Sequence, residues 1–194
     1  MSQQAHDPLL NARRTGYTRT GFGAQYHAYR PKPPAVLVKA LLQLAQTRRP
    51  RLVVDLGSGT GISAGLWAPH AERVIGVEPL DEMRRIAEAG NRSPNVHFQA
   101  GVAQQTGLPD GAADIVTCAQ SLHHTEPETT LAEIGRILRV GGVFAAYDYD
   151  WPPMVHWEAN RVFAAFMDGV RTLRKKHGKK PAEWAWGRVR PRSA

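Results

Sequence analysis

Cysteine is nearly absent from this chain of 194 residues: Cys118 is its one thiol, so the chain can form no internal disulfide. No apolar run approaches the ~20 residues that a membrane span needs. The first ten residues also lack the apolar core of a secretion signal. The composition, 42% hydrophobic and 22% charged, is that of one globular domain with a sizeable core. We therefore expect a cytoplasmic protein without a membrane span.

Acidic residues are scarce at one end of the chain. Residues 171–194 hold nine Lys or Arg and one acid, Glu183, so this segment accounts for the whole net charge of +8. Residues 1–170 are neutral as a whole. Such a basic end can be a solvated tail, or it can bind nucleic acid through the phosphates. The solvated tail is the more common case, and nucleic-acid binding by residues 171–194 is the alternative.

Apolar runs and amphipathic segments alternate along the middle of the chain. The apolar runs predict strands at 51–56, 73–78, 95–99, 113–119 and 143–147. Three- and four-residue spacing of apolar residues predicts helices at 36–45, 61–67, 80–89, 126–138 and 158–173. This alternation predicts an α/β fold with a Rossmann-like, doubly wound, mostly parallel sheet that helices cover on both faces.

The most informative segment is Val53–Ser63, where a short strand is followed by Gly57, Gly59 and Gly61 and then by a helix. A strand, a glycine turn and a helix N-terminus let a nucleotide-like ligand approach the bare backbone. A dinucleotide-binding fingerprint needs glycine where Ile62 stands, and a phosphate-binding P-loop needs a lysine that this turn lacks. The alternative is a glycine-rich turn that binds no ligand.

Asp55–Gly61 resembles motif I of the class I S-adenosylmethionine (SAM)-dependent methyltransferases. Residues 26 to about 154 look like a methyltransferase type 11 domain, of the UbiE-like or trans-aconitate-methyltransferase-like kind. The other matching segments are Tyr29–Pro31, Gly76–Pro79, Leu108–Gly111, Ala113–Val116, Ala119–His123 and Arg136–Gly142. The resemblance implies SAM as the cofactor and the strand order 3-2-1-4-5-7-6, with the seventh strand antiparallel.

The resemblance also implies how the first two strands would hold SAM. Asp55 would lie near the ammonium group, and the methionine part would lie against Gly57, Ser58, Gly59 and Gly61. Glu78 ends the second strand, 21 residues after Gly57, where an acid in this topology accepts hydrogen bonds from the ribose hydroxyls. The structural alternative for Glu78 is a helix N-terminal acid beside Pro79.

Two further contacts with SAM follow from the resemblance. Many family members place an aspartate after the third strand to bond the adenine amino group, and this chain has Val102 there. Gln104 or backbone groups would then replace that contact. Gln120 follows the fourth strand and would lie at the floor of the SAM pocket.

The catalytic residues are unknown from sequence, and three candidates stand out. His123 and His124 could act as a general base near neutral pH or could simply line the pocket. They are poor metal candidates, because no Cys or acid lies at a ligand spacing. Tyr29 belongs to Tyr26–Pro31, a segment that could close over the site as a lid or lie on the surface as an arm. Aromatic residues that could wall an acceptor pocket are Tyr147, Tyr149 and Trp151.

These expectations divide the chain into an N-terminal arm or lid at 1–34, a SAM-binding core at 35–155, a helix at 156–177 and a basic, disordered tail at 178–194. Only five strands are readable, so we expect that a C-terminal truncation or frame change removed the last two strands of the family pattern.

The favoured function is methyl transfer from SAM to a small molecule. The alternatives are an inactive SAM-binding remnant and an RNA methyltransferase that uses the basic tail. No Asn/Asp-Pro-Pro-Tyr/Phe motif follows the fourth strand, which weighs against methylation of an amino group of adenine or glutamine.

Overall fold

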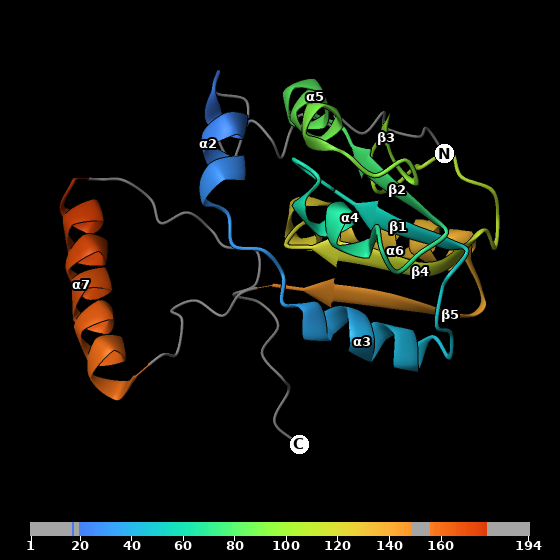
Figure 1. The fold of residues 1–194 in the computed structure, drawn as a ribbon. Helices are drawn as coiled ribbons and strands as arrows, with labels where there is room; N and C mark the ends of the chain where they lie inside the picture. Colours follow the sequence, from blue (N-terminus) through green and yellow to red (C-terminus); the bar gives the residue numbers. More distant parts are fainter. Residues whose placement is uncertain (1–16, 18–19, 149–155, 178–194) are drawn as a thin grey trace, which may run out of the picture. The chain divides into compact units, whose positions relative to one another are not determined.

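The computed structural model describes Tyr17 and residues 20–148 and 156–177. The chain divides into two compact units, Met1–Tyr147 and Asp148–Ala194. The first unit contains a five-stranded parallel sheet with helices around it (Figure 1). Its elements are α2 Phe22–Tyr29, α3 Ala35–Leu44, β1 Leu52–Leu56, α4 Ile62–Trp67, β2 Arg73–Glu78, α5 Asp81–Gly90, β3 Val96–Ala100, β4 Ala113–Ala119, η1 Leu122–His124, α6 Pro127–Ile137 and β5 Leu138–Tyr147.

The strand order is β3-β2-β1-β4-β5, and every neighbouring pair is parallel. This confirms the predicted Rossmann-like α/β fold and the first five positions of the expected order. Because the order reverses direction at β1, a crevice for a ligand is expected at the carboxyl ends of β1 and β4. A sixth or seventh strand does not occur in the part of the chain that the structure describes.

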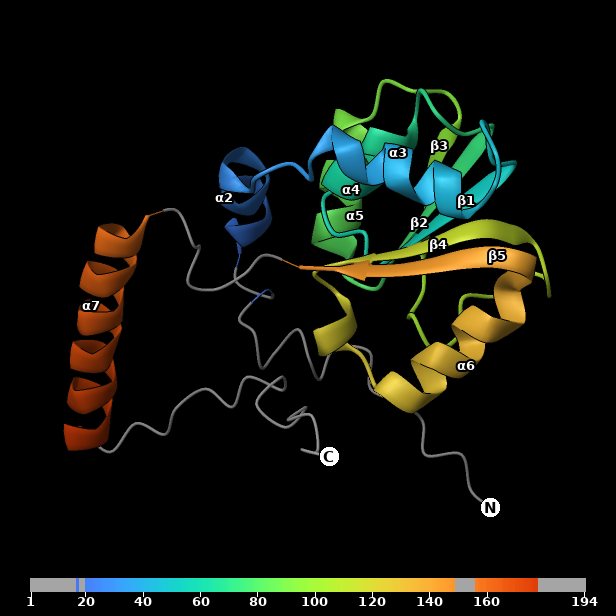
Figure 2. The same ribbon diagram turned by 90° about the horizontal axis from the view of Figure 1, so that it is seen from below.

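Alternating residues of the strands build two apolar layers, one on each face of the sheet. Val53 of β1 and Ile115 of β4 face α3 and α4, where Trp67 is buried. Val54 and Val116 face the opposite way, toward α6 and the loop after β3. Figure 2 shows α3 and α4 on one side of the strands and α6 on the other. Burial on both faces explains why the strands read as nearly continuous apolar runs.

One strand begins earlier than its sequence indicates. The helix before β5 was predicted to reach Leu138, with the strand starting at Val143, but α6 ends at Ile137 and β5 starts at Leu138. A register irregularity near the start of β4 lets Leu138 pair with Ala113. Asp114 then accepts a hydrogen bond from Arg139 Nε at 2.5 Å, which ties this added part of β5 to β4.

Asp114 also fixes the start of β1. Its Oδ2 accepts hydrogen bonds from the backbone N–H groups of Arg51 at 2.8 Å and Leu52 at 3.0 Å. Burial opposes ionisation, but these bonds and Arg139 hold the pKa of Asp114 below its ordinary value. A charged aspartate therefore joins β1, β4 and β5 at the amino end of the sheet, opposite the predicted ligand crevice.

The second unit contains the helix α7, Trp157–Lys176, which agrees with the predicted helix at 158–173. Its apolar residues Val162 and Phe166 are 66% and 63% exposed. No helix among the described residues is both long enough and apolar enough to span a membrane. Tyr149, Trp151 and the expected basic tail at 178–194 lie outside the described residues.

Candidate functional site

Three glycines form the turn between β1 and α4, and each meets a different environment. A Cβ atom at Gly57 would lie 2.5 Å from Ser121 Cβ, and one at Gly61 would lie 2.7 Å from Phe98 Cζ. These two positions are glycine because their neighbours leave no room. Gly59 has φ +55°, and a Cβ there would meet nothing within 4 Å. Gly59 is thus the glycine that opens onto free space at the carboxyl end of β1.

Hydrogen bonds hold this turn against the end of β2. The N–H groups of Gly57 and Ser58 donate to the carbonyl of Val77 at 2.9 and 3.1 Å. The N–H of Gly59 donates to Glu78 Oε2 at 2.8 Å. Ser58 is buried, and its Oγ has no partner in the structure. Three backbone N–H groups of the turn are therefore bonded to the end of β2 without any contribution from a ligand.

Glu78 lies beside the turn, as its place in the sequence predicts. Its Oε1 accepts the N–H of Leu80 at 2.9 Å, so each carboxylate oxygen takes one backbone hydrogen bond. Each oxygen keeps capacity to accept another. Burial raises the pKa of Glu78, although these two N–H groups and Arg84 lower it. The carboxylate is therefore oriented and able to accept further hydrogen bonds from hydroxyl groups.

Asp55 lies beneath the turn and is fully buried. Its Oδ1 accepts hydrogen bonds from Thr117 Oγ1 at 2.7 Å and Ser63 Oγ at 3.4 Å, while Oδ2 has no hydrogen-bond partner among the described residues. Burial raises the pKa of Asp55 to about 7, against the lowering effect of Thr117 and Ser63. The sequence placed Asp55 and Glu78 on adjacent strands, and the β1–β2 register confirms this.

The segment after β4 lies at the same carboxyl edge of the sheet as the glycine turn. Gln120 has φ +55°, a conformation that costs energy for a residue other than glycine and that is frequent at functional sites. Its N–H donates to the carbonyl of Tyr147 at 2.8 Å. Ser121 Oγ donates to the carbonyl of Leu56 at 2.5 Å, which brings this segment against Gly57. The structure thus brings Gln120 and the glycine turn together.

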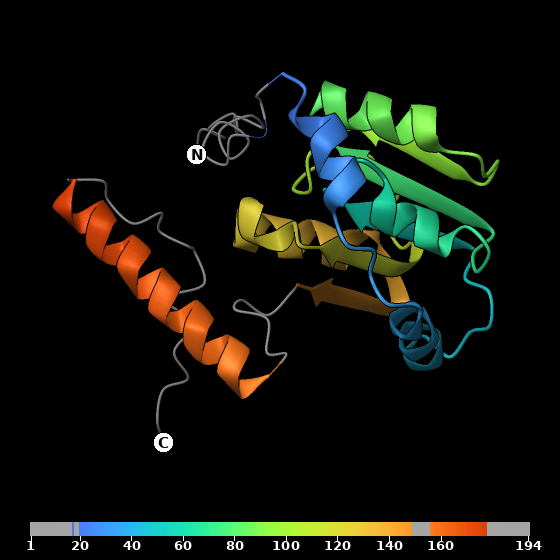
Figure 3. The ribbon, with the colours of Figure 1, turned by 60° about the vertical axis from the view of Figure 1, so that its left-hand side comes forward.

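The N-terminal segment covers part of this edge. Tyr17 packs edge-on against His124 with ring centroids 5.4 Å apart, and its Oη lies 3.5 Å from His124 Nε2. Helix α2 was not predicted; it packs on α5 through Gly23, where a Cβ would lie 2.6 Å from Ile86 Cδ1 (Figure 3). The segment therefore contacts both α5 and η1 at the carboxyl edge of the sheet.

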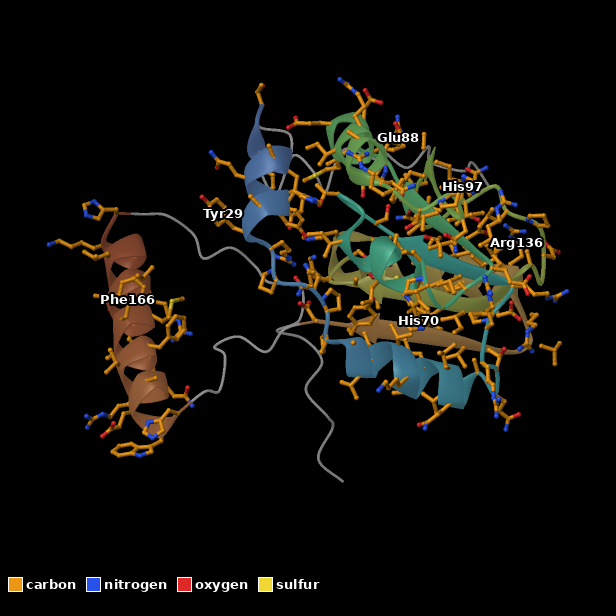
Figure 4. The ribbon with its side chains drawn as sticks, viewed as in Figure 1. Tyr29, His70, Glu88, His97, Arg136 and Phe166 are labelled. Atoms are coloured by element: carbon orange, nitrogen blue, oxygen red, sulfur yellow. The ribbon has the colours of Figure 1, made fainter. Side chains whose placement is uncertain are left out.

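The three catalytic candidates differ in surroundings. Burial, together with the nearby His123 and Arg30, lowers the pKa of His124 to about 4. A neutral imidazole with this pKa is a weak base. The ring of His123 lies beside it, with centroids 3.9 Å apart and the two ring planes tilted by 56°. Tyr29 ends α2 and is 85% exposed, so the structure does not bring it into contact with the turn (Figure 4).

The loop between β3 and β4 is held by α6, an interaction that sequence reasoning missed. Glu133 Oε1 accepts hydrogen bonds from Thr106 N at 2.8 Å and Thr106 Oγ1 at 2.6 Å. Arg136 binds Glu133 and lowers its pKa to about 2. Gln104 lies in this loop, next to a short bridge between Val102 and Gln105. Glu133 stands three residues before Arg136 on α6, and this spacing could have predicted their ion pair from the sequence.

Metal binding finds no support in the described part of the chain, where no three His, Cys, Asp or Glu side chains gather into a possible metal site. Cys118 is buried on β4, and burial followed by the nearby Asp55 raises the pKa of its thiol to about 12. The thiol is therefore protonated near neutral pH and is a residue of the core.

Comparison with known proteins decides the family. The sequence profile of a family described as "Methyltransferase domain" (Methyltransf_11) matches residues 54–146. The chain contains a class I SAM-dependent methyltransferase domain. A similar protein is the uncharacterized methyltransferase YcgJ of Bacillus subtilis, 31% identical over 116 residues, or 58% of this chain and 46% of YcgJ. The crystal structure of YcgJ matches the methyltransferase domain with a TM-score of 0.53 at 29% identity, covering 58% of this chain and 50% of that one.

A second relative of the methyltransferase domain is the ubiquinone/menaquinone biosynthesis C-methyltransferase UbiE of Rubrivivax gelatinosus. It is 31% identical over 115 residues, which cover 59% of this chain and 45% of UbiE. The chain thus spans about half the length of the curated relatives that it matches.

The residues of the methyltransferase domain fit SAM, the cofactor of this family. Gly59 leaves open space where a side chain would stand, and Glu78 beside it can accept hydroxyl hydrogen bonds. Asp55 supplies a buried acid beneath the turn, and its Oδ2 accepts no hydrogen bond from the part of the chain that the structure describes. A cation with a ribose, such as SAM, matches this set of groups. The role of each residue in binding stays a prediction.

Proposed function

We propose that the methyltransferase domain transfers a methyl group from SAM to a small-molecule acceptor. The observation that carries this proposal is the pairing of Gly59 with Glu78: an open glycine turn lies 2.8 Å from a carboxylate that the backbone has already oriented. This pair stands at the carboxyl edge of a sheet whose strand order reverses beside it, where α/β folds bind ligands.

Each predicted residue has a proposed part in holding SAM. Glu78 accepts the ribose hydroxyls, and Asp55 provides negative charge for the ammonium end. Gln104 and the backbone beside it lie along the adenine. The methionine part lies against the glycine turn and the segment after β4, whose residues are Gly57, Ser58, Gly59, Gly61 and Gln120.

When bound, SAM would supply a methyl group on a positively charged sulfur. An acceptor atom would form a bond to the methyl carbon as the bond from that carbon to sulfur breaks; the sulfur would leave as a neutral thioether, and the acceptor's proton would pass to a base or to water. The protein's work is then alignment and exclusion of water. Tyr17 and α2 cover the edge between α5 and η1, which favours a small acceptor over a bulky one. Among the base candidates, His123 is favoured over His124, because the pKa of His124 near 4 makes it a weak base at neutral pH.

Two alternatives make different predictions. An inactive remnant would bind SAM and transfer nothing. An RNA methyltransferase would need strong, salt-sensitive RNA binding that is lost when residues 171–194 are removed. The name of the UbiE relative, a C-methyltransferase of ubiquinone/menaquinone biosynthesis, supports the small-molecule proposal for this chain.

The test is transfer of labelled methyl from SAM to separate pools of small molecules, which include quinols and carboxylic acids, and to total RNA. The proposal predicts label in a small-molecule pool that disappears in the variant Glu78→Gln. Label in RNA alone would favour the RNA alternative. SAM binding without label in any pool would favour the inactive remnant.

A further inference from the structure

A row of polar side chains lies along one face of the sheet at its carboxyl edge. It contains Asp55 of β1, Thr117 of β4 and Tyr147 of β5, and Ser63 of α4 completes it. Asp55 and Thr117 are register partners. Tyr147 Oη lies 2.6 Å from Ser63 Oγ, which in turn lies 3.4 Å from Asp55 Oδ1. A hydrogen-bonded chain therefore runs from the edge strand to the acid of the glycine motif.

The direction of the hydrogen bonds in this row follows from the chemistry of its members. A carboxylate only accepts, so the hydroxyls of Thr117 and Ser63 both donate to Asp55. The single proton of Ser63 is then used, so Tyr147 must donate to Ser63. Burial, followed by the nearby charge of Asp55, raises the pKa of Tyr147, which therefore keeps its proton near neutral pH.

Among the residues that the structure describes, no cationic side chain is found to act on the charge of Asp55. The charged group that chiefly acts on it is Glu78, whose charge has the same sign. The other titratable groups that face it are Cys118 on β4 and Tyr147 on β5, and neither is cationic in any state. A buried carboxylate next to acids and hydroxyls is stabilised when a cation arrives. A cationic ligand would supply the opposite charge that the described residues around Asp55 do not.

We propose that Tyr147 is a positioning residue for the methionine end of SAM: through Ser63, it keeps Asp55 oriented and ionised beneath the glycine turn. The inference rests on the proposed function, because it takes SAM as the ligand. It extends that function to β5, a strand whose residues have no direct part in the glycine motif. Tyr147 acts through Asp55 and is not itself a catalytic residue.

The test compares two ligands by calorimetric titration of the full chain. SAM carries the cationic methionine end, while 5′-methylthioadenosine keeps the adenine and ribose but lacks that end. For the variant Tyr147→Phe, we expect SAM binding about tenfold weaker near pH 7 and methylthioadenosine binding unchanged. Ser63→Ala should have a similar effect. Because the two residues act in one chain, the double variant should lose little more than either single variant.

The pH profile gives a second readout that simple loss of packing would not change. Wild-type SAM affinity should rise as pH increases through about 7, where Asp55 ionises. In Tyr147→Phe this rise should move to higher pH, because the carboxylate has lost support. Comparing the two proteins at each pH cancels the titration of SAM itself. Thr130→Val is the matched control, since the Thr130 hydroxyl is also buried but has no partner.

The outcomes separate the inference from the proposed function. Unchanged SAM affinity in a folded Tyr147→Phe variant would overturn the inference alone. Equal weakening of both ligands, or the same loss in Thr130→Val, would show structural damage in place of positioning and would also overturn it. A folded wild type that binds neither ligand would overturn the proposed function.

Discussion

Replacing Asp55 with asparagine should make stability less sensitive to pH. Asp55 is fully buried, and burial raises its pKa from 3.8 to about 7. A carboxyl group whose pKa is higher in the folded state stabilises the fold while it is protonated. That stabilisation is complete below the unfolded pKa and is lost as pH rises through the folded pKa. The window for Asp55 therefore runs from about pH 4 to about pH 7.

The size of the effect follows from the width of that window. Each unit of pKa difference corresponds to about 1.4 kcal/mol, so the wild type should lose about 2–3 kcal/mol of unfolding free energy between about pH 5 and pH 8 through this group. The asparagine of the variant cannot ionise, so the variant should lose none of it. The assay is urea unfolding of wild type and Asp55→Asn at several pH values, in which contributions from other groups cancel in the difference.

Asp114→Asn is the control, because the pKa of Asp114 is shifted in the direction opposite to that of Asp55. The pKa of Asp114 is lowered, so its ionised form stabilises the fold above the unfolded pKa, and this is lost only as pH falls through the folded pKa. The difference between this variant and wild type should stay constant from about pH 5 to pH 8. If the Asp55→Asn difference is equally constant, Asp55 ionises normally in the folded protein and the reasoning is refuted.

Three further predictions concern the turn, the loop and the N-terminal helix. Gly59→Ala should weaken SAM binding in calorimetry, and Gly107→Ala is the control that should not. Both glycines have positive φ and open space around them, so urea unfolding should show that each change costs about 1–2 kcal/mol in stability. Glu133→Gln should lower stability by about 1–3 kcal/mol and speed amide exchange in the loop after β3, and unchanged exchange there would contradict the role of this acid. Gly23→Val should displace α2 and expose His124, so an NMR titration should show the pKa of His124 rising from about 4 toward its ordinary value. An unchanged pKa would show that α2 does not control the burial of His124.

The centre of the sheet could be predicted from the sequence because β1, β2 and β4 are largely buried, mostly apolar runs. Burial on both faces requires such runs, and the glycine turn and Glu78 mark the ends of β1 and β2. Helix α2 was missed even though Phe22, Tyr26 and Tyr29 recur at helical spacing. Its eight residues include Gly23, which weakens the local helical signal and is explained only by the contact with α5.

The polar row beneath the glycine turn could not be predicted from sequence. Thr117 and Ser63 look like ordinary small residues in a strand and a helix. Their contact with Asp55 depends on the register between β1 and β4 and on the place of α4 above them. The sequence predicted that Tyr147 lines an acceptor pocket, whereas in the structure its hydroxyl is hydrogen-bonded to Ser63. Long-range register of this kind appears only once the strands are paired.

The central claim is that SAM binds at the carboxyl ends of β1 and β2, and calorimetric titration of SAM tests it most directly. The titration should be run on wild type, on Glu78→Gln and on Glu88→Gln, a half-exposed acid of α5 (Figure 4). We predict saturable binding by wild type and Glu88→Gln, and binding weakened at least about tenfold in Glu78→Gln. Equal affinity in all three folded proteins, or no binding by folded wild type, would contradict the claim.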